Sequence, residues 1–591
     1  MSESGVWSFR KLAIFYSLLA LALLLAYLPA LTGTPIWDDF GLIYGHPGSH
    51  GTDALKNIWF NLRNSVQYYP LTDTTWWIEA QLFGDGTASH HIVNVLLHAM
   101  NSVLLLVLLQ RLKFKFAIVA ALIFAFHPLA VESVAWMCER KNLLACSFAL
   151  LSVIWFVKSQ AESSNRDFWV SLLFFALALL SKSAVVALPL ALIPLTRWKK
   201  WCVLPFFGLS VASSALTVWL ELGVNKLPPL EPLPVMDRLT LAGLAPWFYG
   251  SKMVVPANLS FIYPRWDLAS LRFAGVTLLI LSLAIVLVAT IRAKHHPQVA
   301  FGVSGFFAGM LPVIGFLDVD IHRYTFVTDH FAYFSLLPFC ALVAWLFGRL
   351  VETLSAKSNA SPSLLIPMLA VVAPLFAVTF SRASDYVSEE QMFRVTTAQQ
   401  NTSWPAQLML AESLGRNRKI SEAQTAYAKA EQMNPTNLEL QMRIAAFELS
   451  SNNPEAAVNR YTRICGADAR YASLLGLAAD KLAKLEQWEL FKTAADTGTK
   501  YGDPLSLQLL VSALCNPESK LHNPAEALAA ARKACEDRKA ATGAHLFALA
   551  IAYAANDDPA NARATAKKAM EKTGDTDARE KLQKFLESLE R

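Results

Sequence analysis

The chain of 591 residues is 54% hydrophobic and only 17% charged, with a net charge of +6. Because soluble domains carry roughly 25% charged residues, this composition excludes a wholly soluble protein. The small basic excess does not indicate nucleic-acid binding and is better explained by basic loops beside membrane spans. The apolar runs end near residue 381. This predicts a membrane domain over residues 1–381, a linker over 382–403 and a soluble domain over 404–591.

Eleven apolar stretches of the first domain are predicted to cross the membrane, because each is close to the length that a spanning helix needs. They are residues 12–33, 91–111, 116–131, 143–158, 168–181, 183–196, 201–221, 271–292, 298–317, 331–350 and 363–380. An apolar stretch at 239–256 is interpreted instead as interfacial or re-entrant, because a twelfth span would place Arg292 and Lys294 outside.

Basic residues set the predicted orientation of these spans. Lys and Arg gather after the second, fourth, sixth, eighth and tenth stretches, so all five clusters fall on one side, which is predicted to be the cytoplasm with the N-terminus. Four other connections and the whole C-terminal domain then lie on the far side. These connections are residues 34–90, 132–142, 222–270 and 318–330.

The C-terminal domain shows an internal repeat of about 34 residues, the length of a tetratricopeptide helix pair. In each 34-residue step counted from Trp404, the eighth position is alanine, a small residue that lets two helices approach closely. Pairs of a polar residue and proline mark the helix starts. About five helix pairs and a closing helix over 578–590 are expected, and the array is either a concave groove for a partner or only a stabilising cap. The alanines are Ala411, Ala445, Ala479 and Ala513, and the starts are Asn453-Pro454, Asn523-Pro524 and Asp558-Pro559.

The first far-side loop begins with two adjacent carboxylates, Asp38 and Asp39, at the membrane boundary. Charged groups at that depth are costly and suggest a functional site, although adjacent acids at a loop end are often only solvated. Further polar and aromatic motifs follow on the same predicted side. They are Tyr68-Tyr69-Pro70-Leu71-Thr72, His90-His91 through His98, His127-Pro128 through Asn142, Ser181-Lys182-Ser183, Phe261-Ile262-Tyr263-Pro264, His322-Arg323-Tyr324 and Asp329-His330.

This order of motifs resembles the transmembrane O-mannosyltransferases that carry tetratricopeptide repeats, and their bacterial relatives, within the GT-C superfamily of glycosyltransferases. The block HPLAVESVAWMCERKN, residues 127–142, is the most specific match, and the order extends over the whole chain. Asn142 departs from an expected Asp, and His330 stands where the family often has Arg. The resemblance implies an all-α fold, with a polytopic GT-C-like membrane helix bundle of about 11 spans followed by a soluble tetratricopeptide-like α-solenoid.

The resemblance also implies a chemistry. A sugar on a polyprenyl phosphate would pass with inversion to a hydroxyl acceptor, such as a protein Ser or Thr, with Asp38 or Asp39 as general base and the other orienting it. Cationic side chains would stabilise the leaving phosphate, or they would only extend to the membrane–water interface. The candidate cations are Arg140, Lys141, Lys182 and Arg323. The candidates that orient substrate, or pair within the bundle, are His91, His127, Glu132, Tyr263, Asp329 and His330.

No cofactor is predicted with certainty, and the lipid-linked sugar is expected as a substrate. A divalent metal on the loop carboxylates is the less favoured alternative, because no third acid completes an oxygen cage and the seven cysteines lack metal-type spacing. The expected partners are the polyprenyl-phosphate sugar, an acceptor protein in the repeat groove, and membrane lipids, without nucleic acid.

A non-enzymatic alternative is a membrane-anchored repeat scaffold for the assembly of an envelope or pilus complex. Eleven spans exceed what an anchor requires, which favours the enzyme. The compact size and the lack of a retention signal favour a multi-pass protein of a bacterial inner membrane with a periplasmic repeat domain. The endoplasmic reticulum membrane is the alternative location.

Overall fold

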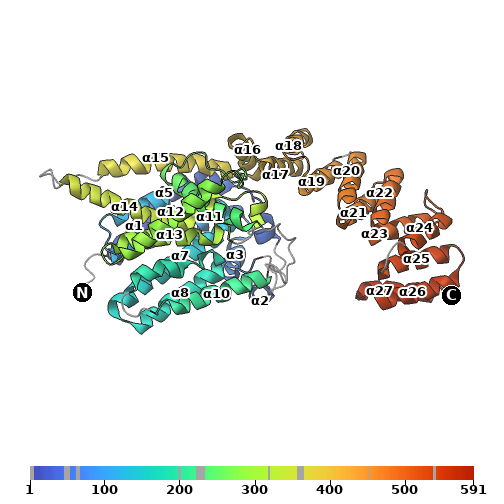
Figure 1. Cartoon of the computed structure of the whole chain (residues 1–591), viewed down its shortest axis with the longest axis horizontal. Coiled ribbons are helices and arrows are strands. Elements are labelled where there is room, and N and C mark those ends of the chain that lie inside the picture. Colours follow the sequence, from blue (N-terminus) through green and yellow to red (C-terminus); the bar gives the residue numbers. More distant parts are fainter. Residues whose placement is uncertain are drawn as a thin grey trace. The chain divides into compact units, whose positions relative to one another are not determined.

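The structure, a computed structural model, describes residues 6–45, 53–61, 67–196, 201–220, 233–316, 320–355, 365–451, 453–536 and 541–590. Every regular element in these ranges is a helix, in agreement with the predicted all-α class (Figure 1). The chain divides into two compact units, Met1–Leu410 and Ala411–Arg591. The first unit therefore also takes in residues 382–410, which the sequence suggested as a linker and the start of the repeats. Four residues of the predicted basic clusters, Arg197, Lys199, Lys200 and Lys357, lie outside the described ranges.

Seven helical segments of the described chain are long and apolar enough to cross a membrane. An eighth is the pair of Ala117–Phe126 and Pro128–Ala135, which bends by 53° where Pro128 interrupts the helix. The number of spans thus stands at seven or eight by length and composition, and the predicted eleven is not confirmed. The seven are Phe9–Ala26, Thr87–Arg111, Met137–Glu162, Trp201–Val218, Arg272–Ile291, Asp329–Thr353 and Met368–Tyr386.

The remaining predicted spans form shorter helices. Helix α8 (Asn165–Ser181) has 17 residues, and the apolar segments Ser183–Leu195 and Pro297–Val313 are shorter than a full span. Prolines explain why Ser183–Leu195 is broken, because Pro189 and Pro194 each open a new short helical turn, in α9 (Leu188–Leu192) and in the 3₁₀ turn Ile193–Leu195. Helices of this length lie at or below the lower limit of about 17 residues for a membrane span.

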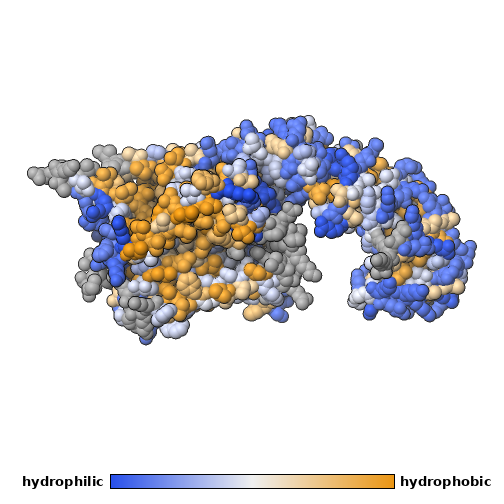
Figure 2. All heavy atoms as spheres, in the orientation of Figure 1, coloured by the Kyte–Doolittle hydropathy of each residue, from blue (hydrophilic) through white to orange (hydrophobic). Residues whose placement is uncertain are grey.

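Two helices form the centre of the first unit. Helix α4 (Thr87–Arg111) and helix α7 (Arg140–Glu162) lie in segments that are 61% and 72% buried, whereas α1 (Phe9–Ala26) and α12 (Arg272–Ile291) are only 22% and 17% buried. The outer helices expose large apolar side chains such as Ile280, Leu283 and Ile291. Figure 2 shows such hydrophobic residues gathered over this unit. An exposed apolar surface of this extent is that of a membrane protein.

The stretch that includes residues 239–256 forms helix α11 (Val235–Val254), which packs along α12. The two helices touch through glycines, since a Cβ added to Gly243 would lie only 1.8 Å from the carbonyl oxygen of Gly275. Small residues at such a crossing let two backbones approach closely. The other helices of this unit are α2 (Ala54–Phe60), α3 (Pro70–Phe83), α5 (Ala117–Phe126), α6 (Val131–Ala135), α10 (Leu204–Val218), α13 (Pro297–Met310), α14 (Tyr333–Ser355), α15 (Leu365–Ala383) and α16 (Glu389–Gln399).

The repeats form five helix pairs and a closing helix, as predicted. The three helices expected to start at proline do so, at Pro454, Pro524 and Pro559. Ala411, Ala445 and Ala479 are fully buried, but Ala513 is only half-buried, because α23 begins at Pro504, two residues before the 34-residue step from Trp404. The helices are α17 (Trp404–Arg416), α18 (Ile420–Met433), α19 (Leu438–Ser450), α20 (Pro454–Ala467), α21 (Ser473–Lys484), α22 (Trp488–Tyr501), α23 (Pro504–Cys515), α24 (Pro524–Glu536), α25 (Gly543–Ala555), α26 (Pro559–Lys572) and α27 (Thr576–Ser588).

Candidate active site

The loop after α1 carries Asp39 into the interior. Its carboxylate accepts hydrogen bonds from the backbone N–H of Ile36, at 2.9 Å, and of Cys138, at 2.8 Å. Only 1% of the residue is exposed. Burial raises the pKa of Asp39 to about 7, although the two backbone hydrogen bonds lower it. Asp39 therefore joins the first loop to the segment that leads into α7.

Asp38 differs from its neighbour in exposure, since it is half-buried. Its negative charge interacts favourably with the ammonium group of Lys141. The two adjacent acids thus have separate positions. Asp39 is held inside by backbone donors, and Asp38 is the more exposed of the two.

Two lysines share one carboxylate beside Asp38. Glu139 lies 3.2 Å from the Nζ of Lys141 and 3.0 Å from the Nζ of Lys182, and its side chain is only 1% exposed. Asp73 of α3 completes a group that we call the charged cluster, namely Asp38, Asp73, Glu139, Lys141 and Lys182. Burial raises the pKa of Asp73 to about 7, and Lys141 partly opposes that effect.

Helix α3 and the residue before it are fixed to the end of α8 by hydrogen bonds to the two residues that flank Lys182 in the sequence. The hydroxyl of Thr72 donates to the carbonyl oxygen of Ser181 at 3.0 Å, and the hydroxyls of Tyr69 and Ser183 lie 3.2 Å apart. These contacts explain why the Tyr-Pro-Leu-Thr and Ser-Lys-Ser motifs, more than 100 residues apart, meet at one place. The structure thus brings together the predicted Tyr-Pro-Leu-Thr motif and the Ser-Lys-Ser motif that contains Lys182.

Arg140 is held by contacts within the protein. Its Nε donates to Asn94 Oδ1 at 2.9 Å, its Nη2 donates to the carbonyl oxygen of His90 at 3.0 Å, and its Nη1 pairs with Glu79. The residue is completely buried. All three guanidinium nitrogens are therefore engaged within the protein, which favours a structural ion pair, and the predicted contact with phosphate stays a prediction.

His127 is also engaged on both sides of its ring. Its Nδ1 accepts from the N–H of Leu129 at 3.2 Å, so its Nε2 carries the proton and donates to the carbonyl oxygen of Met253 at 2.9 Å. This arrangement holds the bend after α5 against the end of α11. These contacts agree with the expected alternative that His127 pairs within the bundle, and its role in orienting substrate stays a prediction.

Four other predicted residues join a second, fully buried group. Glu132 Oε1 lies 2.5 Å from His330 Nδ1 and accepts from the hydroxyl of Thr328 at 2.9 Å. Asp329 accepts from Tyr263 at 2.8 Å and from Arg382 at 2.7 Å. Tyr386 donates to Glu132 at 3.1 Å. We call this the buried network, namely Glu132, Tyr263, Thr328, Asp329, His330, Arg382 and Tyr386.

Two predicted residues lie next to the first loop. His91 is buried on α4 beneath Gly33, where a Cβ would lie 3.2 Å from its Nε2. Arg323 is half-buried at the end of the 3₁₀ turn Asp320–Arg323, and the ring of the following Tyr324 lies 6.1 Å from that of Trp37. Neither position assigns a substrate contact, so both roles stay predictions.

Sequence reasoning missed Asp73, Glu79, Arg382 and Tyr386. Glu79 was detectable as a lone acid in the apolar run Trp76-Trp77-Ile78, because an unpaired charge there is costly. Arg382 and Tyr386 follow the last apolar stretch, where basic and aromatic residues are common at a membrane interface. Their ordinary setting gave no sign that they turn inward.

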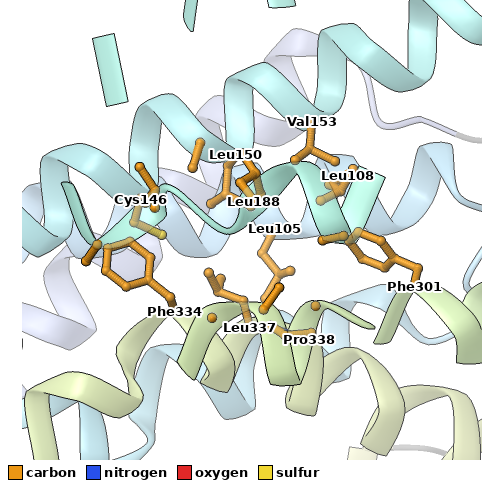
Figure 3. Close-up of a pocket in the computed structure, with 17 residues that line it drawn as sticks. Leu105, Leu108, Cys146, Leu150, Val153, Leu188, Phe301, Phe334, Leu337 and Pro338 are labelled. Atoms are coloured by element: carbon orange, nitrogen blue, oxygen red, sulfur yellow. The ribbon is translucent and has the colours of Figure 1, made fainter. Parts of the chain in front are cut away.

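An apolar cavity of about 80 Å³ lies in the membrane part of the first unit. Figure 3 shows Leu105 of α4, Leu150 of α7, Phe301 of α13 and Leu337 of α14 around it. Its lining is made almost entirely of aliphatic and aromatic side chains. Such a space suits a hydrocarbon chain and not a charged group.

Among the described residues, no group of three or more His, Cys, Asp or Glu side chains is arranged to hold a metal ion. The predicted preference for metal-independent chemistry stays a prediction. The residues of the charged cluster include two ammonium groups, which can supply positive charge toward a phosphate directly.

The buried carboxyls predict a pH dependence of stability. The pKa of Asp39 rises from 3.8 to about 7 on folding, so its protonated form is favoured in the folded state. The associated stability is complete below pH 4 and is lost as the pH rises through about 7, by at most on the order of 4 kcal/mol. Melting temperatures between pH 5 and 8 should therefore fall less steeply for Asp39→Asn than for the wild type.

Asp267→Asn is the control for this comparison, because Asp267 is exposed in a surface turn. It should leave the slope of the wild type unchanged. Parallel slopes for the wild type and Asp39→Asn would contradict the raised pKa. Asp73 contributes in the same direction, so the slope should be reduced but not abolished.

Comparisons with known proteins agree with the resemblance. The family described as dolichyl-phosphate-mannose-protein mannosyltransferase matches residues 70–220, a range that contains four of the five residues of the charged cluster. A protein O-mannosyl-transferase of Caenorhabditis elegans is 24% identical over 456 residues, which cover 72% of this chain and 63% of that protein. The chain is thus O-mannosyltransferase-like, and its C-terminal repeats agree with the family resemblance seen in the sequence.

Vertebrate relatives match shorter stretches. The protein O-mannosyl-transferase TMTC4 of Homo sapiens is 31% identical over 25% of this chain and 25% of its own length. The mouse TMTC1 protein is 32% identical over 24% of this chain and 17% of its own length. This chain therefore spans less than two thirds of each of these relatives. The solved structure of yeast Tom70 aligns with a TM-score of 0.23 at 11% identity, too low to indicate a shared fold.

Proposed function

We propose that this protein is a membrane glycosyltransferase that moves a sugar, mannose by analogy with its relatives, from a polyprenyl phosphate to a hydroxyl of an acceptor protein. One observation carries the proposal. Asp38, the more exposed of the two adjacent acids, lies beside the Lys141, Lys182 and Glu139 group where membrane helices end. The similarity to protein O-mannosyl-transferases supports the reaction class.

The chemistry follows from the two kinds of charge. Asp38 accepts the proton of the acceptor hydroxyl while that oxygen attacks the anomeric carbon of the sugar, with inversion. The bond from this carbon to the phosphate oxygen breaks, and its electron pair leaves with the phosphate. Lys141 and Lys182 stabilise the negative charge that develops there. Asp39 keeps Asp38 in place through the backbone of the same loop.

In this scheme each lysine contacts Glu139 and can also donate a hydrogen bond to phosphate. Each lies at hydrogen-bond distance from Glu139, which offsets the cost of burying two like charges together. A phosphate arriving between them gives each ammonium group a second acceptor. Lys has three donors, so such a bridge needs no release of Glu139.

The lipid part of the donor requires an apolar environment, and the apolar lining of the cavity between α4, α7, α13 and α14 supports contact with a short part of an isoprenoid chain. The repeat unit supports a role in binding the acceptor protein. A groove that holds the acceptor near the membrane raises its effective concentration at the site without taking part in the chemistry.

The orientation in the membrane belongs to the same proposal. The basic connections face the cytoplasm, and the charged cluster and the repeats face the periplasm or the lumen. Alkaline phosphatase fused after Arg591 should be active in bacterial cells, and a green fluorescent protein fusion at the same place should stay dark. The opposite pair of results would reverse the assigned orientation.

The reaction itself is tested with purified protein in lipid nanodiscs. Radiolabelled polyprenyl-phosphate mannose and a Ser/Thr-rich peptide should give labelled peptide. Mild alkali should then release the labelled sugar from the peptide, as it does for O-linked sugars. Lys182→Ala should raise the donor concentration needed for half-maximal rate. Absence of labelled peptide with polyprenyl-phosphate mannose, glucose and N-acetylglucosamine alike would refute transfer from such donors and favour the scaffold alternative.

A further inference from the structure

The chain segment directly after the last membrane helix reaches back to the loop that carries Asp38. Helix α16 begins at Glu389, and the Ser388 side chain caps it by accepting from the N–H of Gln391 at 3.2 Å. The Glu389 side chain turns back from this first helical position. Its Oε1 accepts a hydrogen bond from the backbone N–H of Trp37 at 3.2 Å. Glu389 is 7% exposed, so water does not readily replace it.

Trp37, the residue directly before Asp38, has an unusual backbone conformation. Its φ is +44°, in the left-handed region that bulky residues avoid because the Cβ crowds the backbone. Such a conformation persists only when its surroundings fix it. The direction in which the next side chain leaves the backbone depends on this torsion. The contacts of Trp37 therefore control where Asp38 points.

Aromatic rings hold the Trp37 side chain from several sides. Its ring is stacked parallel to that of Trp136 at a centroid distance of 6.3 Å, and Phe261 lies 5.2 Å away. Phe393, one turn along α16 from Glu389, lies 6.4 Å away. The segment after the last helix thus contacts both the backbone and the side chain of Trp37.

A second main-chain contact joins the same two segments. The N–H of Thr34 donates to the carbonyl oxygen of Val387 at 2.9 Å. Tyr386, the preceding residue, is anchored by its hydrogen bond to Glu132 in the buried network. The segment that carries Glu389 is therefore itself fixed to the centre of the unit, and it can act as a rigid support for the first loop.

We propose that Glu389 is a positioning residue, which holds Trp37 in its left-handed conformation and thereby aims the Asp38 carboxylate at the acceptor hydroxyl. This inference rests on the proposed function for its effect on rate. Its structural part, the fixing of the first loop by Glu389, stands on the contacts alone. Glu389 does not contact substrate in this scheme.

The test compares three variants in nanodiscs. Glu389→Ala removes the acceptor of the Trp37 N–H, and Glu389→Gln keeps a carbonyl oxygen at that place. Glu390→Ala is the matched control, because the neighbouring glutamate instead pairs with Arg394 on its own helix, at 2.9 Å. Hydrogen exchange of the peptide that contains Trp37 should quicken in Glu389→Ala and remain near wild type in the other two.

The kinetic readout separates positioning from general damage. Glu389→Ala should lower kcat by on the order of 10–100-fold with little change in KM, since a small misalignment of a base costs rate rather than binding. Glu389→Gln should recover most of the rate. In an Asp38→Asn background, Glu389→Ala should cause no further loss, because both changes act through the same group.

The two levels of the proposal fail differently. Unchanged exchange at Trp37 in Glu389→Ala would overturn the positioning role whatever the activity. Faster exchange with wild-type kcat would overturn the link between this loop and catalysis. If the wild type transfers no sugar, the proposed function fails, while the exchange measurement still decides whether Glu389 fixes the loop. The positioning role would also be overturned if Glu389→Gln kept the slow exchange of the wild type at Trp37 but lost as much rate as Glu389→Ala.

Discussion

Asp38→Asn is expected to lower the rate of sugar transfer by about 10²–10⁴-fold, the usual contribution of a general base. The reason is that an amide cannot accept the proton of the acceptor hydroxyl at neutral pH. The change keeps the size of the side chain, and Asp38 is half-buried rather than enclosed, so the melting temperature should stay close to that of the wild type. Initial rates with saturating donor and peptide measure the effect.

Asp39→Asn provides the comparison within the same loop. Its carboxylate accepts from two backbone N–H groups, and an amide has only one oxygen to offer them. This variant should lose rate, and its melting temperature should also fall, because the loop loses a hydrogen bond. The control is again Asp267→Asn, which should be unaffected in both. Asp38→Asn with wild-type rate would remove Asp38 from the catalytic role.

Arg140→Ala is expected to destabilise the protein by about 3–5 kcal/mol, because it leaves a buried carboxylate without its partner. The carboxylate is that of Glu79. Burial acts to raise its pKa, but the hydrogen bond with His90 and the charge of Arg140 lower the pKa to about 2. Glu79 therefore stays ionised in the folded protein and needs the guanidinium beside it. Thermal unfolding in detergent, followed by loss of monodisperse protein, measures the change.

A double replacement distinguishes a lost ion pair from a lost packing contact. Glu79→Met with Arg140→Met removes both charges and keeps most of the volume, so it should restore much of the stability that Arg140→Ala loses. Arg272→Ala is the matched single control, since that arginine pairs with Asp237 while 49% exposed and such pairs contribute less than about 1 kcal/mol. Equal effects of Arg140→Ala and Arg272→Ala would refute the buried ion pair.

The repeats show what local sequence can predict. Each helix pair is set by neighbouring residues, such as the prolines that open α20, α24 and α26, so spacing alone located them. Ala513 departs because its helix starts early, a shift that the repeat period cannot reveal. The acidic pair and the Ser-Lys-Ser motif were likewise visible, as charged groups next to apolar runs.

Arg140 and Lys141 show what local sequence cannot predict. Arg140 and Lys141 are adjacent in the sequence, but successive helical residues point about 100° apart. One of them faces Glu79, which lies 61 residues earlier, and the other faces Asp38. Only the packing of α3 against the start of α7 separates the two roles. The contact of Glu389 with Trp37 crosses 352 residues and carries no local signal at all.

That separation in sequence has a consequence for biosynthesis. Trp37 and Asp38 leave the ribosome with the first membrane helix, but Glu389 follows only after the last one. At a synthesis rate of about 5–20 residues per second, the delay over 352 residues is roughly 20–70 s. During that interval the nascent loop lacks the contact of Glu389 with Trp37. Under the proposed function, the protein would become competent only once its entire membrane domain has been inserted, so incomplete chains would not consume lipid-linked sugar.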